Sequence, residues 1–70
     1  MKLTFGDKLI LALRHRGMTQ EELAKKTFFS ESTISRYIKD KGGPPDYIRA
    51  VVLARALNMD PSYFIKEVDI

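Results

Sequence analysis

The sequence predicts a compact all-α domain built from five helices, and three observations lead to this fold class. Apolar residues recur at helical spacing in several stretches, and residues that typically cap helices precede those stretches. No stretch alternates polar and apolar residues as a half-buried strand would. The chain has 70 residues, of which 44% are hydrophobic, so we expect one small core and a single domain over residues 1–70.

The first predicted helix runs from Phe5 to Arg16 and has signals at both ends. Thr4 precedes it as an N-cap, and Asp7 lies in the first turn, where a negative charge suits the helix dipole. Basic residues occupy its last turn, where the dipole favours positive charge. Gly17 follows and can take the left-handed conformation that often ends a helix.

The second predicted helix has the clearest start in the chain. Thr19 and Glu22 are spaced to form a capping box, in which each side chain accepts a hydrogen bond from the backbone N–H of the other residue. About seven residues of helix fit between Thr19 and Phe28. We therefore expect a short helix followed by a tight turn.

The third predicted helix spans about residues 31–39, with Ser30 as its N-cap. Ile34 and Ile38 lie one turn apart and are expected to face the core, with Tyr37 beside them. The outward-facing positions are then Glu31, Ser32, Ser35, Arg36 and Lys39. This helix is apolar on one side and carries small and charged polar groups on the other.

Two further helices complete the prediction. The stretch 40–45 contains two glycines and two prolines and separates the third helix from the fourth. Asp46 is expected to cap a helix over 47–57, and Asn58 to end it in a left-handed conformation. The apolar stripe of this helix is predicted at Tyr47, Val51, Ala54 and Leu57. Asp60, followed by proline, predicts the start of a short fifth helix that reaches about residue 66.

Charge and hydropathy restrict where such a protein works. No apolar run approaches the ~20 residues that a membrane-spanning helix needs. Charged residues interrupt the N-terminal stretch, which lacks the pattern of a signal peptide. We expect a soluble cytoplasmic protein. The net charge of +3 is compatible with a polyanionic partner, but by itself it does not identify one.

The residues needed for catalysis or cofactor binding are missing from the sequence. The chain has no cysteine, and His15 is its one histidine, so no metal site is predicted. The sequence shows no pair of carboxylates, no nucleophile with a base, and no glycine-rich phosphate loop. We therefore expect no enzyme activity, no cofactor and no small-molecule ligand.

Two short helices joined by a tight turn suit the reading of DNA, because the major groove is ~12 Å wide and admits one helix. The segments 19–26 and 30–36 resemble the helix-turn-helix of the lambda-repressor-like (Cro/XRE) family. The likeness extends over about residues 5–66 and leaves a short tail at 67–70. It implies a five-helix fold with the motif in helices two and three, and double-stranded DNA as the partner.

The resemblance implies that ten residues contact DNA: Thr19, Gln20, Ser30, Glu31, Ser32, Thr33, Ser35, Arg36, Lys39 and Lys41. Gln20 matches a position that contacts a backbone phosphate. The stretch 30–33 matches residues that meet phosphate and base edges, and Arg36 matches a further base-reading position. Lys39, Lys41 and the glycines after them match a segment that lies along the adjacent phosphate backbone.

Three of these charged residues are open to a second interpretation. Taken alone, Arg36 and Lys39 are typical solvated surface charges, and it is their place in the motif that favours contact with DNA. Phosphates repel the carboxylate of Glu31. Glu31 can accept a hydrogen bond from N4 of a cytosine, or it can be no more than a negative partner of the helix dipole.

The sequence departs from the family in three places. Phe28 stands where the turn usually carries a left-handed glycine, so either Phe28 is strained or the turn has another geometry. We expect Phe28 to pack locally, and the alternative is that it touches DNA or a partner. Leu13 and Ile38 stand where many members bury an Arg–Glu pair, and an apolar pair can replace such a pair without loss of stability. The loop before Asp46 is one residue longer than usual.

Several apolar residues fall where related sequences are often polar, and they either complete the core or form a self-association surface. The resemblance further implies dimerisation through the C-terminal helices, which favours Tyr63, Phe64 and the tail. The candidate dimer-interface residues are Ile48, Val52, Tyr63, Phe64, Val68 and Ile70. The function implied is a transcriptional repressor, of the kind that phages and mobile elements carry, acting as a dimer on a palindromic operator. The alternative is a protein-interaction module on the same fold, such as an antitoxin or a regulatory adaptor.

Overall fold

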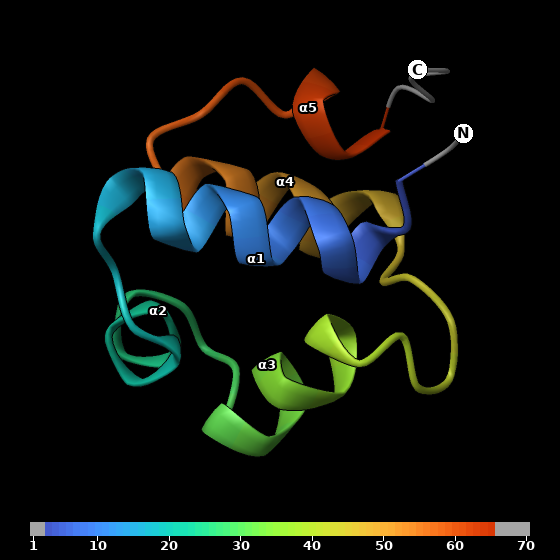
Figure 1. Ribbon diagram of the computed structural model, residues 1–70, viewed down its shortest axis with the longest axis horizontal. Helices are drawn as coiled ribbons and strands as arrows, with labels where there is room; N and C mark the ends of the chain where they lie inside the picture. Colours follow the sequence, from blue (N-terminus) through green and yellow to red (C-terminus); the bar gives the residue numbers. More distant parts are fainter. Residues whose placement is uncertain (1–2, 66–70) are drawn as a thin grey trace.

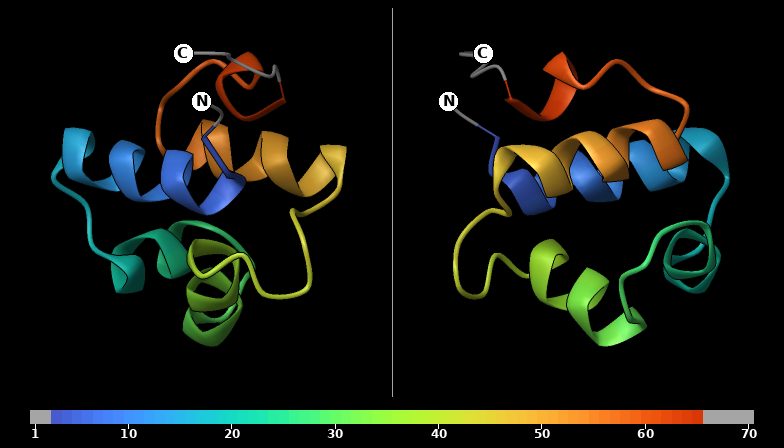
Figure 2. Two further views of the ribbon diagram at one scale, coloured as in Figure 1. Left: turned by 45° about the vertical axis from the view of Figure 1, so that its right-hand side comes forward. Right: turned by 180° about the vertical axis from the view of Figure 1, so that it is seen from behind.

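The computed structural model describes residues 3–65, and this part of the chain forms five helices: α1 (Phe5–Arg16), α2 (Gln20–Lys26), α3 (Glu31–Ile38), α4 (Tyr47–Ala56) and α5 (Ser62–Ile65). The helices α1 and α4 lie side by side as a central layer, with α5 on one side and α2 and α3 on the other (Figure 1). The turned views of Figure 2 keep this arrangement. The predicted all-α class is confirmed, and α3 and α4 each end one residue earlier than expected.

The helix starts are fixed by hydrogen bonds between residues close in sequence. Thr4 and Asp7 form a full capping box, in which each side chain accepts from the backbone N–H of the other at 3.1 Å. Ser30 and Asp46 cap α3 and α4 by accepting from the backbone N–H three residues on. The predicted caps are confirmed.

None of these helices in the described residues 3–65 is long and apolar enough to cross a membrane.

Three helices end in the same way, with a left-handed residue just after the last turn. Gly17 follows α1 with φ 62°, Asn58 follows α4 with φ 58°, and Asp40 follows α3 with φ 56°. At the end of α3 the backbone N–H of Lys41 also donates to the carbonyl of Arg36 at 3.0 Å, which completes a Schellman motif. The sequence predicted the first two endings but not that of Asp40.

Asp40 joins the end of α3 to the start of α1. Its carboxylate accepts a hydrogen bond from the backbone N–H of Gly6 at 2.9 Å and another from the hydroxyl of Thr4 at 2.7 Å. The two helices approach so closely here that a Cβ on Gly6 would overlap the carbonyl oxygen of Ile38. Glycine at position 6 is therefore required by packing and not by backbone conformation.

The core lies between the helical layers and consists of Leu9, Ala12, Leu13, Leu23, Ile34, Ala50, Leu53, Ala54, Leu57 and Phe64. Leu13 is buried and Ile38 half-buried, and the two line one apolar hollow, as the predicted apolar pair requires. The predicted stripe of α4 is partly wrong. Tyr47 is exposed, and α4 instead buries Ala50 and Leu53.

Five aromatic rings form a connected series through the molecule. The ring of Phe29, in the turn before α3, meets that of Tyr37 edge-on at 6.0 Å between centroids. The series continues from Tyr37 to Phe5 at 6.1 Å, to Phe64 at 4.9 Å and to Tyr63 at 5.0 Å. Such contacts add to the stability that the rings gain from burial alone. They connect α3 to α5 through α1.

The structure corrects one of the predicted dimer-interface residues. Phe64 is 7% exposed, because α5 folds back and inserts this ring into the core, so Phe64 is wrong as an interface residue. Tyr63 is half-buried, and its hydroxyl donates to the carbonyl of Lys8 at 3.1 Å. Ile48 is 72% exposed, and Val52 is half-buried. The remaining two candidates, Val68 and Ile70, lie outside the described residues.

The close approach at Gly6 predicts a large cost for adding a single methyl group. In Gly6→Ala the new Cβ meets backbone atoms of Ile38, which cannot rotate away, so α1 and α3 must separate. We expect a loss of about 3 kcal/mol in the free energy of unfolding, at the upper end for overpacking. Denaturant unfolding measures it.

Gly17→Ala is the matched control, because a Cβ there meets nothing and only the left-handed φ of 62° is unfavourable. We expect it to cost about 1 kcal/mol. Equal losses for the two variants would contradict the packing role of Gly6.

Candidate nucleic-acid interface

The turn between α2 and α3 is organised by the hydroxyl of Thr27. After α2, Thr27 adopts extended backbone angles of φ −120° and ψ −175°. Its hydroxyl donates to the carbonyl of Leu23 at 3.0 Å and accepts from the backbone N–H of Phe29 at 3.2 Å. These bonds close the turn without a left-handed residue. Of the two interpretations that the sequence left open, a different turn geometry is therefore correct.

Phe28 has an unstrained backbone, and its side chain does not pack against the protein. The non-glycine residues with positive φ in the described range 3–65 are Asp40 and Asn58, so the backbone of Phe28 is unstrained. Its side chain is 101% exposed, and the expectation that it packs locally is wrong. Because Thr27 holds the turn and Phe29 fills the core side, the ring of Phe28 is left in solvent at the edge of the motif.

The start of α3 carries a cluster of small hydroxyl groups. The Oγ of Ser30 accepts from the backbone N–H of Thr33 and lies 3.1 Å from the Oγ of Ser32 and 3.0 Å from the Oγ1 of Thr33. Below them Ile34 is completely buried, so the helix is anchored on its inner side. Small side chains let the backbone of this turn approach a ligand closely.

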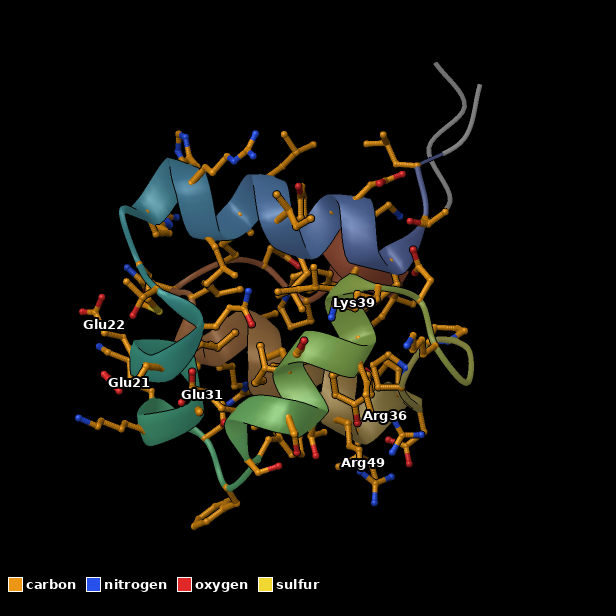
Figure 3. All side chains as sticks on the ribbon, turned by 60° about the horizontal axis from the view of Figure 1, so that its bottom comes forward. Glu21, Glu22, Glu31, Arg36, Lys39 and Arg49 are labelled. Atoms are coloured by element: carbon orange, nitrogen blue, oxygen red, sulfur yellow. The ribbon has the colours of Figure 1, made fainter. Side chains whose placement is uncertain are left out.

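Each of the ten predicted contact residues is accessible. Thr33 and Ser35 are half-buried, and the others are exposed: Thr19, Gln20, Ser30, Glu31, Ser32, Arg36, Lys39 and Lys41. They come from the start of α2, the outer face of α3 and the loop that follows it. Three of them, Glu31, Arg36 and Lys39, are labelled in Figure 3, where α3 lies on the side that faces the viewer.

The start of α2 is held by the predicted capping box. Thr19 Oγ1 accepts from the backbone N–H of Glu22 at 3.1 Å, and Glu22 Oε1 accepts from that of Thr19 at 3.0 Å. The second of these bonds is the main reason why the pKa of Glu22 is lowered, since it stabilises the charged carboxylate. The box leaves Gln20 exposed beside the turn and keeps a negative charge close to it.

Three glutamates and two arginines lie on opposite flanks of this surface. In Figure 3 Glu21, Glu22 and Glu31 lie on the α2 side, whereas Arg36 and Arg49 lie together on the side of the 39–46 loop. Positive charge is present on both flanks, because α2 ends in Lys25 and Lys26.

A hollow of about 330 Å³ lies on the loop side between α3 and α4. Arg36, Lys41 and Arg49 line it together with Gly42 and Gly43, whose φ values of 79° and 82° form the bend of the loop. Lys39 is exposed at the end of α3 but does not line the hollow. Asp46 also lines it and pairs with Arg49, so three cationic side chains and one carboxylate surround the hollow, and the excess of positive charge suits a phosphate group.

Arg49 is a candidate functional residue that the sequence interpretation missed. It lies in the first turn of α4, where the helix dipole disfavours a positive charge, and its guanidinium is held by the Asp46 carboxylate at 2.6 Å. A basic residue in the first turn of a predicted helix was the sequence signal from which Arg49 could have been found. The Asp46 carboxylate offsets this unfavourable position, and it also holds the guanidinium at the hollow.

The helix-turn-helix family model of the Cro/XRE type matches residues 9–64. The chain belongs to this family. Comparison with the curated proteins gave no match. The family consists of DNA-binding domains and not of enzymes, which indicates DNA as the partner of this chain. The predicted fold and family are both confirmed.

The hollow predicts a phosphate contact by Arg49. In Arg49→Gln we expect weaker DNA binding on any sequence, and a plot of log affinity against log salt concentration whose slope is smaller by about one. The cap of α4 survives, because Asp46 Oδ1 accepts from the backbone of residue 49. Fluorescence anisotropy with a labelled duplex at several salt concentrations measures both effects.

Arg55→Gln is the matched control, since Arg55 is an exposed arginine near the other end of the same helix. Its salt slope is expected to stay close to that of the unchanged protein. An equal decrease in both variants would mean that Arg49 acts through net charge alone.

Proposed function

We propose that this protein is a sequence-specific transcriptional repressor that binds a palindromic DNA operator as a homodimer in the cytoplasm. The observation that carries the proposal is the exposed polar face of α3, which lies between two groups suited to phosphate binding. These groups are Thr19 and Gln20 on one flank and the Arg36–Lys41–Arg49 hollow on the other. A helix flanked in this way has the arrangement that major-groove docking requires.

The flanking groups would supply affinity for DNA, and the helix α3 would supply selectivity for a base sequence. Phosphate contacts by Gln20, Lys41 and Arg49 supply most of the affinity and make it sensitive to salt. Selectivity comes from the first turns of α3, where Ser32 and Thr33 are short and Glu31 is long. The guanidinium of Arg36 lies close to Gly42, from where it has access to the loop-side phosphate and to the groove.

An operator-binding dimer needs a self-complementary surface, and an exposed apolar region beside α3 provides a candidate. Phe28, Phe29, Ile48 and Val52 line one hollow between the turn of the motif and α4, with the Asp46–Arg49 ion pair also in its lining. Phe28 is fully exposed, and Ile48 is 72% exposed. Burying these side chains against a second copy would stabilise a dimer by the hydrophobic effect. Repression would follow from occupancy of the operator.

Selection from random-sequence duplexes tests the function directly. We expect enrichment of a palindrome whose half-sites are about 10 base pairs apart from centre to centre, so that two copies of α3 enter successive major grooves. The affinity for the selected duplex should fall steeply as salt concentration rises. Recovery of no common motif, with binding indifferent to salt, would overturn the proposal.

The apolar hollow predicts that Ile48 contributes to self-association. Ile48→Ser should raise the dimer dissociation constant about tenfold, which corresponds to the loss of roughly 1.5 kcal/mol of apolar burial. Sedimentation equilibrium measures the constant. Leu11→Ser is the control, because Leu11 is an exposed leucine on α1. Identical behaviour of Ile48→Ser and the unchanged protein would exclude this surface as the interface.

The second candidate is a protein-interaction module such as an antitoxin or regulatory adaptor, and the same exposed apolar region favours it. Phe28 and Ile48 offer a surface that another protein could cover. The two candidates differ in the DNA selection. An adaptor whose main ligand is a protein would enrich no palindrome and would remain monomeric in isolation.

A further inference from the structure

Glu31 differs from most acidic residues of the molecule because its carboxylate is free. Within the described residues 3–65, five carboxylates accept hydrogen bonds from backbone N–H groups: those of Asp7, Glu22, Asp40, Asp46 and Asp60. In the same range no hydrogen bond or ion pair holds the carboxylate of Glu31 or that of Glu21. Hydrogen bonds therefore hold five of these acids, whereas Glu31 and Glu21 are not held, and Glu31 has only its place in the first turn of α3.

The unbonded carboxylate of Glu31 lies at the end of α3 that would enter the DNA groove. It is the first residue of α3, directly after the N-cap Ser30, and its side chain is exposed. Ser30 already accepts from the backbone N–H of Thr33, so the cap of the helix does not depend on Glu31. Beside it stand Ser32 and Thr33, which are shorter. In a docked helix, Glu31 would therefore reach furthest from this turn towards the base edges.

The chemistry of a carboxylate restricts what it can read there. An ionised carboxylate only accepts hydrogen bonds. In the major groove guanine presents two acceptors, and thymine presents an acceptor and a methyl group, so neither can pair with it. Adenine presents a donor next to the N7 acceptor, which repels a second oxygen. Cytosine presents the N4 amino group, a donor without an adjacent acceptor on the same base.

We propose that Glu31 selects a cytosine at one position of each operator half-site. The inference rests on the proposed function and adds the base that this residue reads. Phosphates repel the carboxylate, so Glu31 contributes little general affinity. Over any other base it loses its hydration without a replacement donor. Its effect is therefore discrimination, expected at about tenfold or more between cytosine and the other bases.

The substitution Glu31→Gln tests the proposal by changing the base that is read. Glutamine keeps the length of the side chain and presents a donor and an acceptor that match N7 and N6 of adenine. Selection with this variant should return the motif of the unchanged protein, with one cytosine per half-site replaced by adenine. Anisotropy titrations of the two matched duplexes should show the preference reversed, with a change of about tenfold or more.

Glu21→Gln is the matched control. Glu21 is likewise an exposed glutamate without a hydrogen bond in residues 3–65, and it lies on α2 instead of the recognition helix. It undergoes the same change of charge, so it should tighten binding to all duplexes alike and leave the selected motif unchanged. Glu31→Ala gives a second measure, because it should bind the four duplexes that vary at this position about equally.

The outcomes separate the inference from the function on which it rests. If the unchanged protein selects a motif and Glu31→Gln selects the same one, Glu31 reads no base, and the repressor function stands. Retained discrimination in Glu31→Ala overturns the inference in the same way. If the unchanged protein selects no motif at all, both proposals fail together. Thermal unfolding of each variant confirms that these differences arise from a folded protein.

Discussion

The close contact between the start of α1 and the end of α3 controls the geometry of the DNA-facing surface. Gly6 lets the two backbones approach, and Asp40 bonds both to Gly6 and to Thr4 at the other side of the contact. The same Asp40 is the left-handed residue that ends α3. The aromatic series from Phe29 to Tyr63 extends this bracing through the molecule. The recognition helix is thus positioned from its end, and its start is left available for a ligand.

What the sequence could predict depended on the distance between interacting residues. Thr19 with Glu22, and Ser30 with Thr33, are three residues apart, so local patterns predict them. Gly17 and Asn58 end their helices for reasons that lie in their own backbone preferences. The role of Asp40 could not be predicted in this way. Its hydrogen-bond partners, Gly6 and Thr4, are 34 and 36 residues away, and no local sequence pattern around Asp40 indicates them.

The same distinction explains the errors in the candidate site. The family pattern predicted glycine at position 28, but the hydroxyl of Thr27 performs that task through bonds visible only once the turn is folded. Phe64 was assigned to the interface because the family resemblance favours dimerisation through the C-terminal helices, and only the folded position of α5 places its ring in the core. Arg49 was missed because only the fold brings α4 beside Lys41 and Arg36. Residues of the motif itself were predicted correctly as accessible, since their spacing places them opposite Ile34.

Because Leu13 and Ile38 are both apolar, the stability of the fold depends less on salt concentration than the affinity for DNA does. Where a family member holds its first and third helices with an ion pair, dissolved salt and acid act on the helix packing as well as on the contacts with phosphate. Here Leu13 and Ile38 supply apolar packing that ionic strength hardly weakens, beside the hydrogen bonds of the Asp40 carboxylate to Gly6 and Thr4. A rise in salt can therefore release the protein from DNA while leaving it folded and ready to bind again.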